Sequence, residues 1–166
     1  MLRVLSIEDM EPIRQWRNQC LSTLRTPFPL TKEQQEQWYR DEICNRASRS
    51  RFWGITLRRL NHTKDVLHGY GGIENIQWEN RIGEISLLVD PEEQGHGVGL
   101  THANIILSRA FNDLNLHTVF AECYQNNPAV TFWNKVFANG YRTILPNRKY
   151  SDGEYVNSVY YSLSKP

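Results

Sequence analysis

The first part of the chain places apolar residues at helical spacing in two segments. "LRVLS" predicts a short strand, after which Ser6 can cap a helix with one apolar face: Met10, Ile13, Trp16 and Cys20. Beyond the proline loop "RTPFPL", the spacing of Thr31 and Gln34 matches a capping box and predicts a second helix, "KEQQEQWYRDEI". That helix has few apolar anchors, so we expect most of its surface to face water or a ligand.

The middle of the chain changes towards the period of two that is typical of strands. "RFWGITLRRL" and "VLHGYGGIENI" predict two strands around the polar turn "NHTKD". "IGEISLLVD" predicts a third strand, whose apolar end is expected to be covered on both faces. A glycine-rich loop, a segment of helical spacing and the strand-like "HTVFAECY" follow. This order predicts a β-α-β unit in the middle of a sheet.

The end of the chain adds one helix and one hairpin. "NPAVTFWNKVFA" predicts the helix, and "GYRTILPNRKYSDGEYVNSVYYSL" predicts two strands around the turn "SDG". The whole pattern favours an α/β or α+β fold with helices on both faces of a mixed sheet. Residues 1–166 contain no repeat, low-complexity tract or linker, so we expect a single domain.

Composition narrows the classes of partner. A chain of 166 residues can bury roughly two-thirds of its unfolded surface in one core. The 19 Lys and Arg against 18 Asp and Glu give no overall field for nucleic acid or anionic lipid, and no apolar run approaches the ~20 residues that span a bilayer. Three cysteines without a C-x-x-C pair, and no export-type start, lead us to expect reduced thiols in the cytoplasm.

The segment "DPEEQGHGVGLTHA" carries the clearest chemical signal. Gly95, Gly97 and Gly99 allow close approach of a ligand to the backbone, and the first amides of the following helix point outward, so the segment predicts an anion cradle. A nucleotide P-loop would need lysine where Leu100 stands. A dinucleotide loop would need G-x-G-x-x-G, whereas the spacing here is G-x-G-x-G.

These letters resemble a known family. "LLVDPEEQGHGVG" is similar to the acetyl-coenzyme A signature of the GNAT superfamily, with Gln94, Gly97 and Gly99 at its key positions. Asn126, Ala129, Trp133 and Lys135 resemble the second signature. The resemblance covers nearly the whole chain. It implies a single GNAT-like domain with a twisted, mostly antiparallel mixed sheet, helices on both faces and a splayed central pair of strands.

The resemblance also implies a set of residues that bind acetyl-CoA. The pyrophosphate would rest on backbone amides of the glycine loop, and the pantetheine arm would pair with the strand before it. Asn126 would hydrogen-bond the arm, and Trp133 would pack on its thioester end or belong to the core. The implied set is Leu87, Leu88, Val89, Gln94, Gly95, His96, Gly97, Val98, Gly99, Leu100, Asn126 and Trp133.

Acetyl transfer to an amine needs a base and a hydrogen-bond donor for the developing oxyanion. The resemblance assigns the donor to the amide near Leu88 and favours Glu84 as the base over Glu74, although both can be solvated strand residues. Many members have a tyrosine acid where this chain has Trp133, whose indole cannot serve as an acid. Solvent or a tyrosine (Tyr124, Tyr141 or Tyr150) would then protonate the thiolate. We expect no metal, because no ligand partners accompany the histidines near the loop.

The acceptor is predicted to lie over the first helices and the late hairpin. Its candidate contacts are Arg17, Arg25, Trp38, Tyr39 and Trp78. We expect direct attack by a small amine in a ternary complex, with an amino-sugar nucleotide first and a polyamine less favoured because no acidic cluster marks the lid regions. Acetylation of a protein N-terminus and a non-catalytic acyl-CoA-binding module are the alternatives. A homodimer is expected by analogy, and no nucleic-acid or membrane partner.

Overall fold

The computed structural model describes residues 1–57, 66–151 and 153–165. The predicted turn "NHTKD", the last three residues of the strand predicted before it, and Asp152 of the predicted "SDG" turn lie outside the described residues. All the elements that surround the glycine-rich loop are described.

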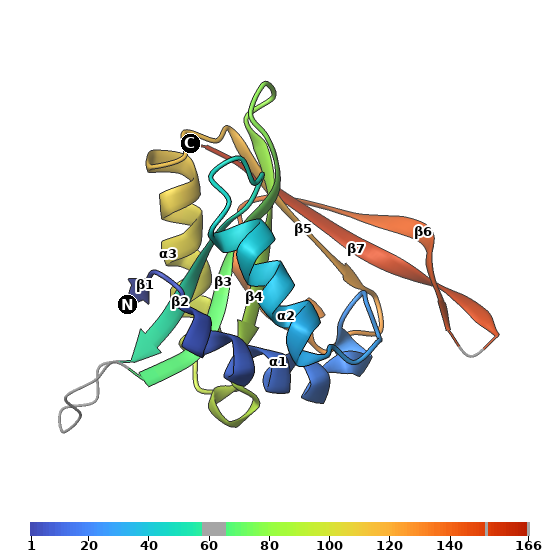
Figure 1. The fold of residues 1–166 in the computed structure, drawn as a ribbon. Coiled ribbons are helices and arrows are strands. Elements are labelled where there is room, and N and C mark those ends of the chain that lie inside the picture. The colour runs from blue at the N-terminus through green and yellow to red at the C-terminus, as the bar shows by residue number, and fades with distance from the viewer. Residues whose placement is uncertain (58–65, 152, 166) are drawn as a thin grey trace.

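Seven strands form one sheet in the order β1-β2-β3-β4-β5-β7-β6 (Figure 1). Among the described residues, β4 and β5 pair in parallel, and the other neighbouring strands are antiparallel. The prediction of a mixed, mostly antiparallel sheet is therefore confirmed. The strands are β1 (Leu2–Arg3), β2 (Arg51–Leu57), β3 (Val66–Gln77), β4 (Ile82–Val89), β5 (Thr118–Tyr124), β6 (Tyr141–Ser151) and β7 (Glu154–Ser164).

Helices cover both faces of the sheet, as predicted. On one face lie α1 (Met10–Gln19), α2 (Lys32–Trp38) and the π-helical turn η3 (Tyr39–Ile43), and on the other lie α3 (Val98–Asn112) and α4 (Ala129–Val136) (Figure 1). Three short 3-10 helices join them: η1 (Ile7–Asp9), η2 (Leu21–Thr23) and η4 (Pro91–Glu93). Each layer buries its own apolar cluster against the sheet.

The helix starts follow local hydrogen bonding. At α2 the capping box is confirmed, because the Thr31 hydroxyl accepts from the Gln34 amide at 3.2 Å and Gln34 Oε1 accepts from the Thr31 amide at 2.9 Å. The first helix begins later than its predicted cap at Ser6, because residues Ile7–Asp9 form a 3-10 turn. Its predicted apolar face is buried at Met10, Ile13 and Trp16 and half-buried at Cys20.

A fork opens between β4 and β5 in the middle of the sheet. Their pairing is confined to Ile82–Glu84 against Thr118–Phe120, although β4 continues to Val89 and β5 to Tyr124. The expected splayed pair of strands is therefore confirmed. Beyond the fork, one edge of residues 85–89 has no strand partner in the described part of the chain, so its backbone groups are available to an added extended chain.

Candidate active site

The two faces of β4 carry different chemistry. Leu88 packs with α1 in one apolar cluster, whereas Ile85 belongs to the cluster of α3 and α4. Since side chains alternate along a strand, Glu84 and Ser86 share the α1 face with Leu88. At the fork, β4 therefore presents polar side chains on the α1 side and apolar side chains on the α3 side.

The glycine-rich loop follows β4 and leads into α3. Gly95 and Gly97 have φ values of 83° and 80°, and a Cβ at either would meet no atom within 4 Å. Glycine is therefore required by the left-handed backbone and not by crowding within the protein. Gly97 is the N-cap residue of α3 and no side chain caps this helix, so the first amides of α3 are open to an anion. Gln94 Nε2 donates to the Val89 carbonyl at 3.0 Å and ties the loop to β4.

Glu84 lies where the fork begins and is only 3% exposed. One of its carboxylate oxygens forms an ion pair with the Arg25 guanidinium, and the other accepts from Asn75 Nδ2 at 3.1 Å. The strand register shifts after Glu74, and Asn75 has a φ of 53°. This irregularity brings the Asn75 amide to Glu84, although in a regular strand Asn75 would lie on the face opposite to that of its neighbour Glu74.

Glu74 lies opposite Glu84 in the register of β3 and β4, so the structure brings the two predicted catalytic carboxylates together. Glu74 is half-buried. Burial, and then the charge of Glu84, raise the pKa of Glu74, while Arg25, the Ser86 hydroxyl and Arg17 oppose that rise. The result is a carboxyl group that holds its proton more tightly than a solvated glutamate.

A third carboxylate, Glu122 on β5, was missed by the sequence reasoning. It faces the same side as Phe120, which is in register with Glu84, and Arg148 Nε donates to it at 3.1 Å. Burial tends to raise the pKa of Glu122, but the hydrogen bonds and the charge of Arg148 oppose burial, and the pKa is lowered. The alternation of "TVFAECY" was the available signal, because it places Phe120 and Glu122 on one face.

The expected acceptor contacts separate into two groups. Arg17 donates to the Tyr70 hydroxyl at 2.7 Å, and the Trp38 ring lies 5.7 Å from the Tyr70 ring, centre to centre. Tyr39 packs against the same apolar cluster. These residues gather on the α1 side of β3 and β4. Trp78 does not join them: it lies in the β3–β4 turn with the Arg51 guanidinium 5.5 Å from its ring.

The second signature lies on both sides of the start of α4. Trp133 is 8% exposed and packs with Phe132 and Phe137 in the α3-side core. Asn126 is exposed, whereas the next residue, Asn127, accepts from the Ala129 amide at 2.8 Å and donates to the Thr23 carbonyl at 2.7 Å. The structure therefore fixes the turn before α4 through Asn127 and leaves Asn126 at the surface.

The tyrosines considered as proton donors lie in different places. Tyr141 and Tyr150 are exposed on β6, and Tyr150 pairs with Tyr155 near the end of the hairpin, away from the fork. Tyr124 is buried under the Lys149 ammonium. Tyr160, which the sequence reasoning did not consider, stacks on Phe120. Burial and the charges of Glu84 and Glu122 raise the pKa of Tyr160, which keeps its phenol protonated.

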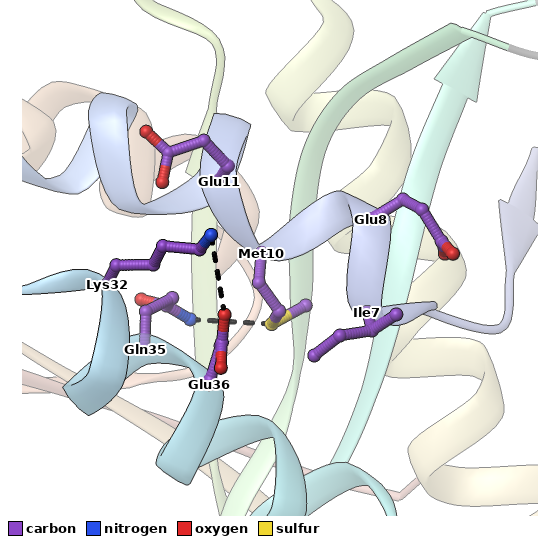
Figure 2. A pocket seen from close by; sticks show the side chains of 7 residues that line it. All are labelled: Ile7, Glu8, Met10, Glu11, Lys32, Gln35 and Glu36. Atoms are coloured by element: carbon purple, nitrogen blue, oxygen red, sulfur yellow. Dashed lines mark hydrogen bonds and ion pairs between the residues drawn. The ribbon is translucent and has the colours of Figure 1, made fainter.

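A separate hollow of about 250 Å³ lies between η1 and the start of α1 on one side and α2 on the other (Figure 2). It contains none of the predicted site residues. Gln35 crosses its floor and donates to the Met10 sulfur at 3.6 Å, and the Lys32 ammonium lies 3.9 Å from Glu36. Its lining residues are Ile7, Glu8, Met10, Glu11, Lys32, Gln35 and Glu36.

No group of three His, Cys, Asp or Glu side chains in residues 1–57, 66–151 and 153–165 is placed to hold a metal ion. Of the helices in this part of the chain, none combines the length and the apolar character needed to cross a membrane.

Comparison with known proteins gives a family and a set of similar folds. The family model described as "Acetyltransferase (GNAT) domain" matches residues 1–131. A mutant of the spermidine N-acetyltransferase SpeG from Vibrio cholerae has a similar structure, with a TM-score of 0.81 and 21% identity over 99% of this chain and 94% of that chain. Mutant forms of the spermidine/spermine N-acetyltransferase SpeG from the same organism give 0.78 and 23%, over 99% and 93%.

A dodecameric structure of the spermidine N-acetyltransferase from Vibrio cholerae, in an intermediate state, is also similar. Its TM-score is 0.78 at 21% identity, over 99% of this chain and 92% of that chain. At these identities the likeness shows a shared fold. No curated protein matches the chain.

Proposed function

The chain belongs to the acetyltransferase (GNAT) domain family, and from this premise we propose that it transfers the acetyl group of acetyl-CoA to the primary amine of a small acceptor. The observation that supports this proposal best is the fork between β4 and β5, which opens next to the uncapped start of α3. The fork offers an edge for an extended arm, and α3 offers amides for a phosphate group. Proteins of this family use acetyl-CoA as the acetyl donor.

The residues around the fork fit acetyl-CoA. The unpartnered edge at Leu87, Leu88 and Val89 suits the amide groups of a pantetheine arm, and the open Cβ positions of Gly95 and Gly97 leave room for a pyrophosphate. The remaining proposed contacts of the loop and of α3 and α4 are Gln94, His96, Val98, Gly99, Leu100, Asn126 and Trp133. When bound, the thioester supplies an acetyl group that an amine can attack.

The chain's own groups then serve the reaction. A carboxylate at the fork, Glu74 or Glu84, accepts a proton from the acceptor amine, so that the nitrogen lone pair becomes available. The backbone amide of Leu88 is the proposed donor to the oxygen that becomes negative. The Tyr160 phenol is a better placed proton source for the departing thiolate than Tyr141 or Tyr150, because it lies beside Phe120 at the fork.

A small cationic amine suits this site as the acceptor. The arginines that could bind a phosphate are engaged: Arg17 with Tyr70, Arg25 with Glu84 and Arg148 with Glu122. Glu74 adds negative charge to the same face. The similar structures that act on spermidine support this choice. An amino-sugar nucleotide is the second candidate, and it would require Arg17 or Arg25 to leave its partner for the phosphates.

A panel of amines tests the proposed function. Acetyl-CoA is mixed with a linear aliphatic polyamine, an amino-sugar nucleotide or a peptide with a free N-terminus, and released thiol and acetylated product are measured together. We expect thiol release to match product with the polyamine. Thiol release with only the amino-sugar nucleotide, or only the peptide, would show that the acceptor belongs to that class and not to the polyamines. Binding of acetyl-CoA without thiol release for any amine would favour a non-catalytic module.

We also propose that the protein forms a homodimer or larger assembly through the β6–β7 hairpin. The hairpin projects away from the rest of the sheet (Figure 1). Tyr141, Tyr150 and Tyr155 are each about two-thirds exposed on it, and Ile144 is also exposed. Exposed apolar side chains gathered on one element are typical of a surface that a second copy covers. The dodecameric relative in fold supports self-association.

A further inference from the structure

Two carboxylates at the fork face one another, and they differ in their bonding partners. Glu74 and Glu84 are directly opposite in the antiparallel pair β3·β4, so their side chains share one face. Two negative charges at such spacing repel each other, and the usual result is that one keeps its charge and the other holds a proton more readily. Which of the two is free to exchange a proton with the acceptor follows from their partners.

Glu84 is fully engaged. Its two carboxylate oxygens are taken by Arg25 and by Asn75, and only 3% of the residue is exposed. The Arg25 side chain, 45% exposed, lies on the solvent side of this ion pair. An acceptor amine would have to displace a guanidinium to reach Glu84. Both oxygens of Glu84 are therefore already held by groups of the chain, which leaves it less accessible to an incoming amine than Glu74.

Glu74 is differently placed. In the described residues, no lysine, arginine or histidine forms an ion pair with it. Its carboxylate accepts a hydrogen bond from the Ser86 hydroxyl. Ser86 belongs to the segment of β4 that has left β5, which is the segment expected to run beside the thioester. Glu74 therefore shares a strand face with Ser86, beside the proposed thioester, whereas both oxygens of Glu84 are held by Arg25 and Asn75.

We propose that Glu74 is the catalytic residue that takes the proton from the acceptor ammonium, and that the Arg25–Glu84 ion pair is a positioning element that adjusts its basicity. This inference rests on the proposed acetyl transfer. An N–H bond of the ammonium breaks and its proton moves to Glu74. The nitrogen lone pair forms the bond to the thioester carbon, and the C–S bond breaks with its electrons on sulfur. The nitrogen then loses a second proton, which converts the departing thiolate to a thiol. Glu74 returns its own proton to solvent.

The charges that face Glu74 support this role. From β4 comes Glu84, from the loop after α1 comes Arg25, from α1 itself comes Arg17, and from β3 the neutral phenol of Tyr70. Burial and Glu84 raise the pKa of Glu74, and the two arginines lower it. A raised pKa brings a carboxylate closer to the working pH and makes it a better base. The base must be unprotonated, so activity should rise as the pH passes upward through this pKa.

The test is the pH profile of kcat with an amine that the wild type acetylates. We expect Glu74→Gln to lower kcat by about 10² or more and to leave acetyl-CoA affinity within about twofold. Glu84→Gln removes the neighbouring negative charge, so the acid limb of its profile should move to lower pH. Arg25→Gln removes a positive charge, so its acid limb should move to higher pH. Glu79→Gln, on the exposed β3–β4 turn, is the matched control and should leave the profile unchanged.

The outcomes separate this inference from the proposed function. Wild-type kcat in Glu74→Gln, or a loss confined to Glu84→Gln, would overturn the assignment while acetyl transfer itself stands. Acid limbs that move opposite to these signs, or not at all, would show that the Arg25–Glu84 pair does not adjust Glu74. Melting temperatures of the variants within a few degrees of the wild type would show that they fold. No thiol release by the wild type with any amine would contradict the proposed function first.

Discussion

Asp9 shows how a single carboxylate shapes the start of α1. It is 6% exposed, accepts two bonds of 2.7 Å from the Arg3 guanidinium, and accepts a third of 2.8 Å from the Ser6 amide. Burial alone would raise the pKa of Asp9, but these bonds outweigh burial and lower it below the usual 3.8. The charged form of Asp9 therefore stabilises the folded protein relative to the unfolded chain.

Asp9→Asn should therefore reduce the free energy of unfolding by about 2 kcal/mol near neutral pH. Because the folded pKa is depressed, the contribution of Asp9 is present above 3.8 and is lost as the pH falls through the folded value. Urea unfolding at neutral and acidic pH would measure this, and the gap between variant and wild type should shrink in acid. Asp113→Asn, which removes an exposed carboxylate paired with Arg109, should cost less than about 0.5 kcal/mol. A gap that is absent, or equal at both pH values, would contradict the role of Asp9.

The three cysteines should differ in reactivity. Cys44 is exposed, Cys20 is half-buried, and Cys123 is buried, with burial and then Glu122 raising the pKa of its thiol to about 11. The thiolate is the reactive form, so Cys123 should react with an aromatic disulfide reagent only after unfolding. Cys44→Ser should remove the fastest phase in the reaction of the native protein with this reagent. Equal rates for Cys44 and Cys123 would show that the β5 side of the fork is open to solvent.

At the level of single residues, the sequence predicted two candidate carboxylates on neighbouring strands but not how they are bonded. The period of two places Glu84 and Glu74 on facing strands, and the structure brings them together. Arg25 comes from an irregular loop 59 residues before Glu84, and Asn75 is turned by a bulge, so no periodicity indicates either contact. Periodicity likewise gave no sign that Arg17 bonds to Tyr70, an interaction that leaves this guanidinium less available to an acceptor.

Among the elements, the glycine-rich loop was predicted most completely, because glycine is tied to a backbone conformation. Gly95 and Gly97 have positive φ, and α3 begins directly after Gly97. The strand and helix that flank the loop were predicted from periodicity. The fork was expected only through the family resemblance, because where two parallel strands diverge depends on packing above and below the sheet and leaves no local pattern.

Gly97→Trp tests the loop as a binding element. A side chain at this position points into open space, where the pyrophosphate is proposed to lie, so acetyl-CoA affinity should fall at least about tenfold. Gly153→Trp is the matched control, because Gly153 has a similar φ of 87° and equally open surroundings on the β6–β7 turn. Both variants carry the backbone cost of a side chain at positive φ, about 1 kcal/mol. Calorimetric titration should show a loss of affinity for Gly97→Trp alone, and equal affinities would contradict the proposed cradle.

Considered as a whole, the molecule is a layered body from which the β6–β7 hairpin projects (Figure 1). If a second copy covers that hairpin, light scattering during gel filtration should give a mass above that of one chain. The double variant Tyr150→Ser, Tyr155→Ser should move the protein towards the single-chain mass without loss of thermal stability, because both rings are exposed. Phe28→Ser, an exposed aromatic in another loop, is the control. A wild type with the mass of one chain at every concentration would contradict self-association.

The most direct test of the central claim, that acetyl-CoA delivers its acetyl group at the fork, is a crystal structure of the protein with coenzyme A. We predict the pantetheine arm along residues 85–89, the pyrophosphate at the first amides of α3, and the sulfur between β4 and β5 close to Glu74 and Tyr160. Coenzyme A bound elsewhere, for example in the hollow between η1 and α2 (Figure 2), with the fork closed by side chains, would contradict the account.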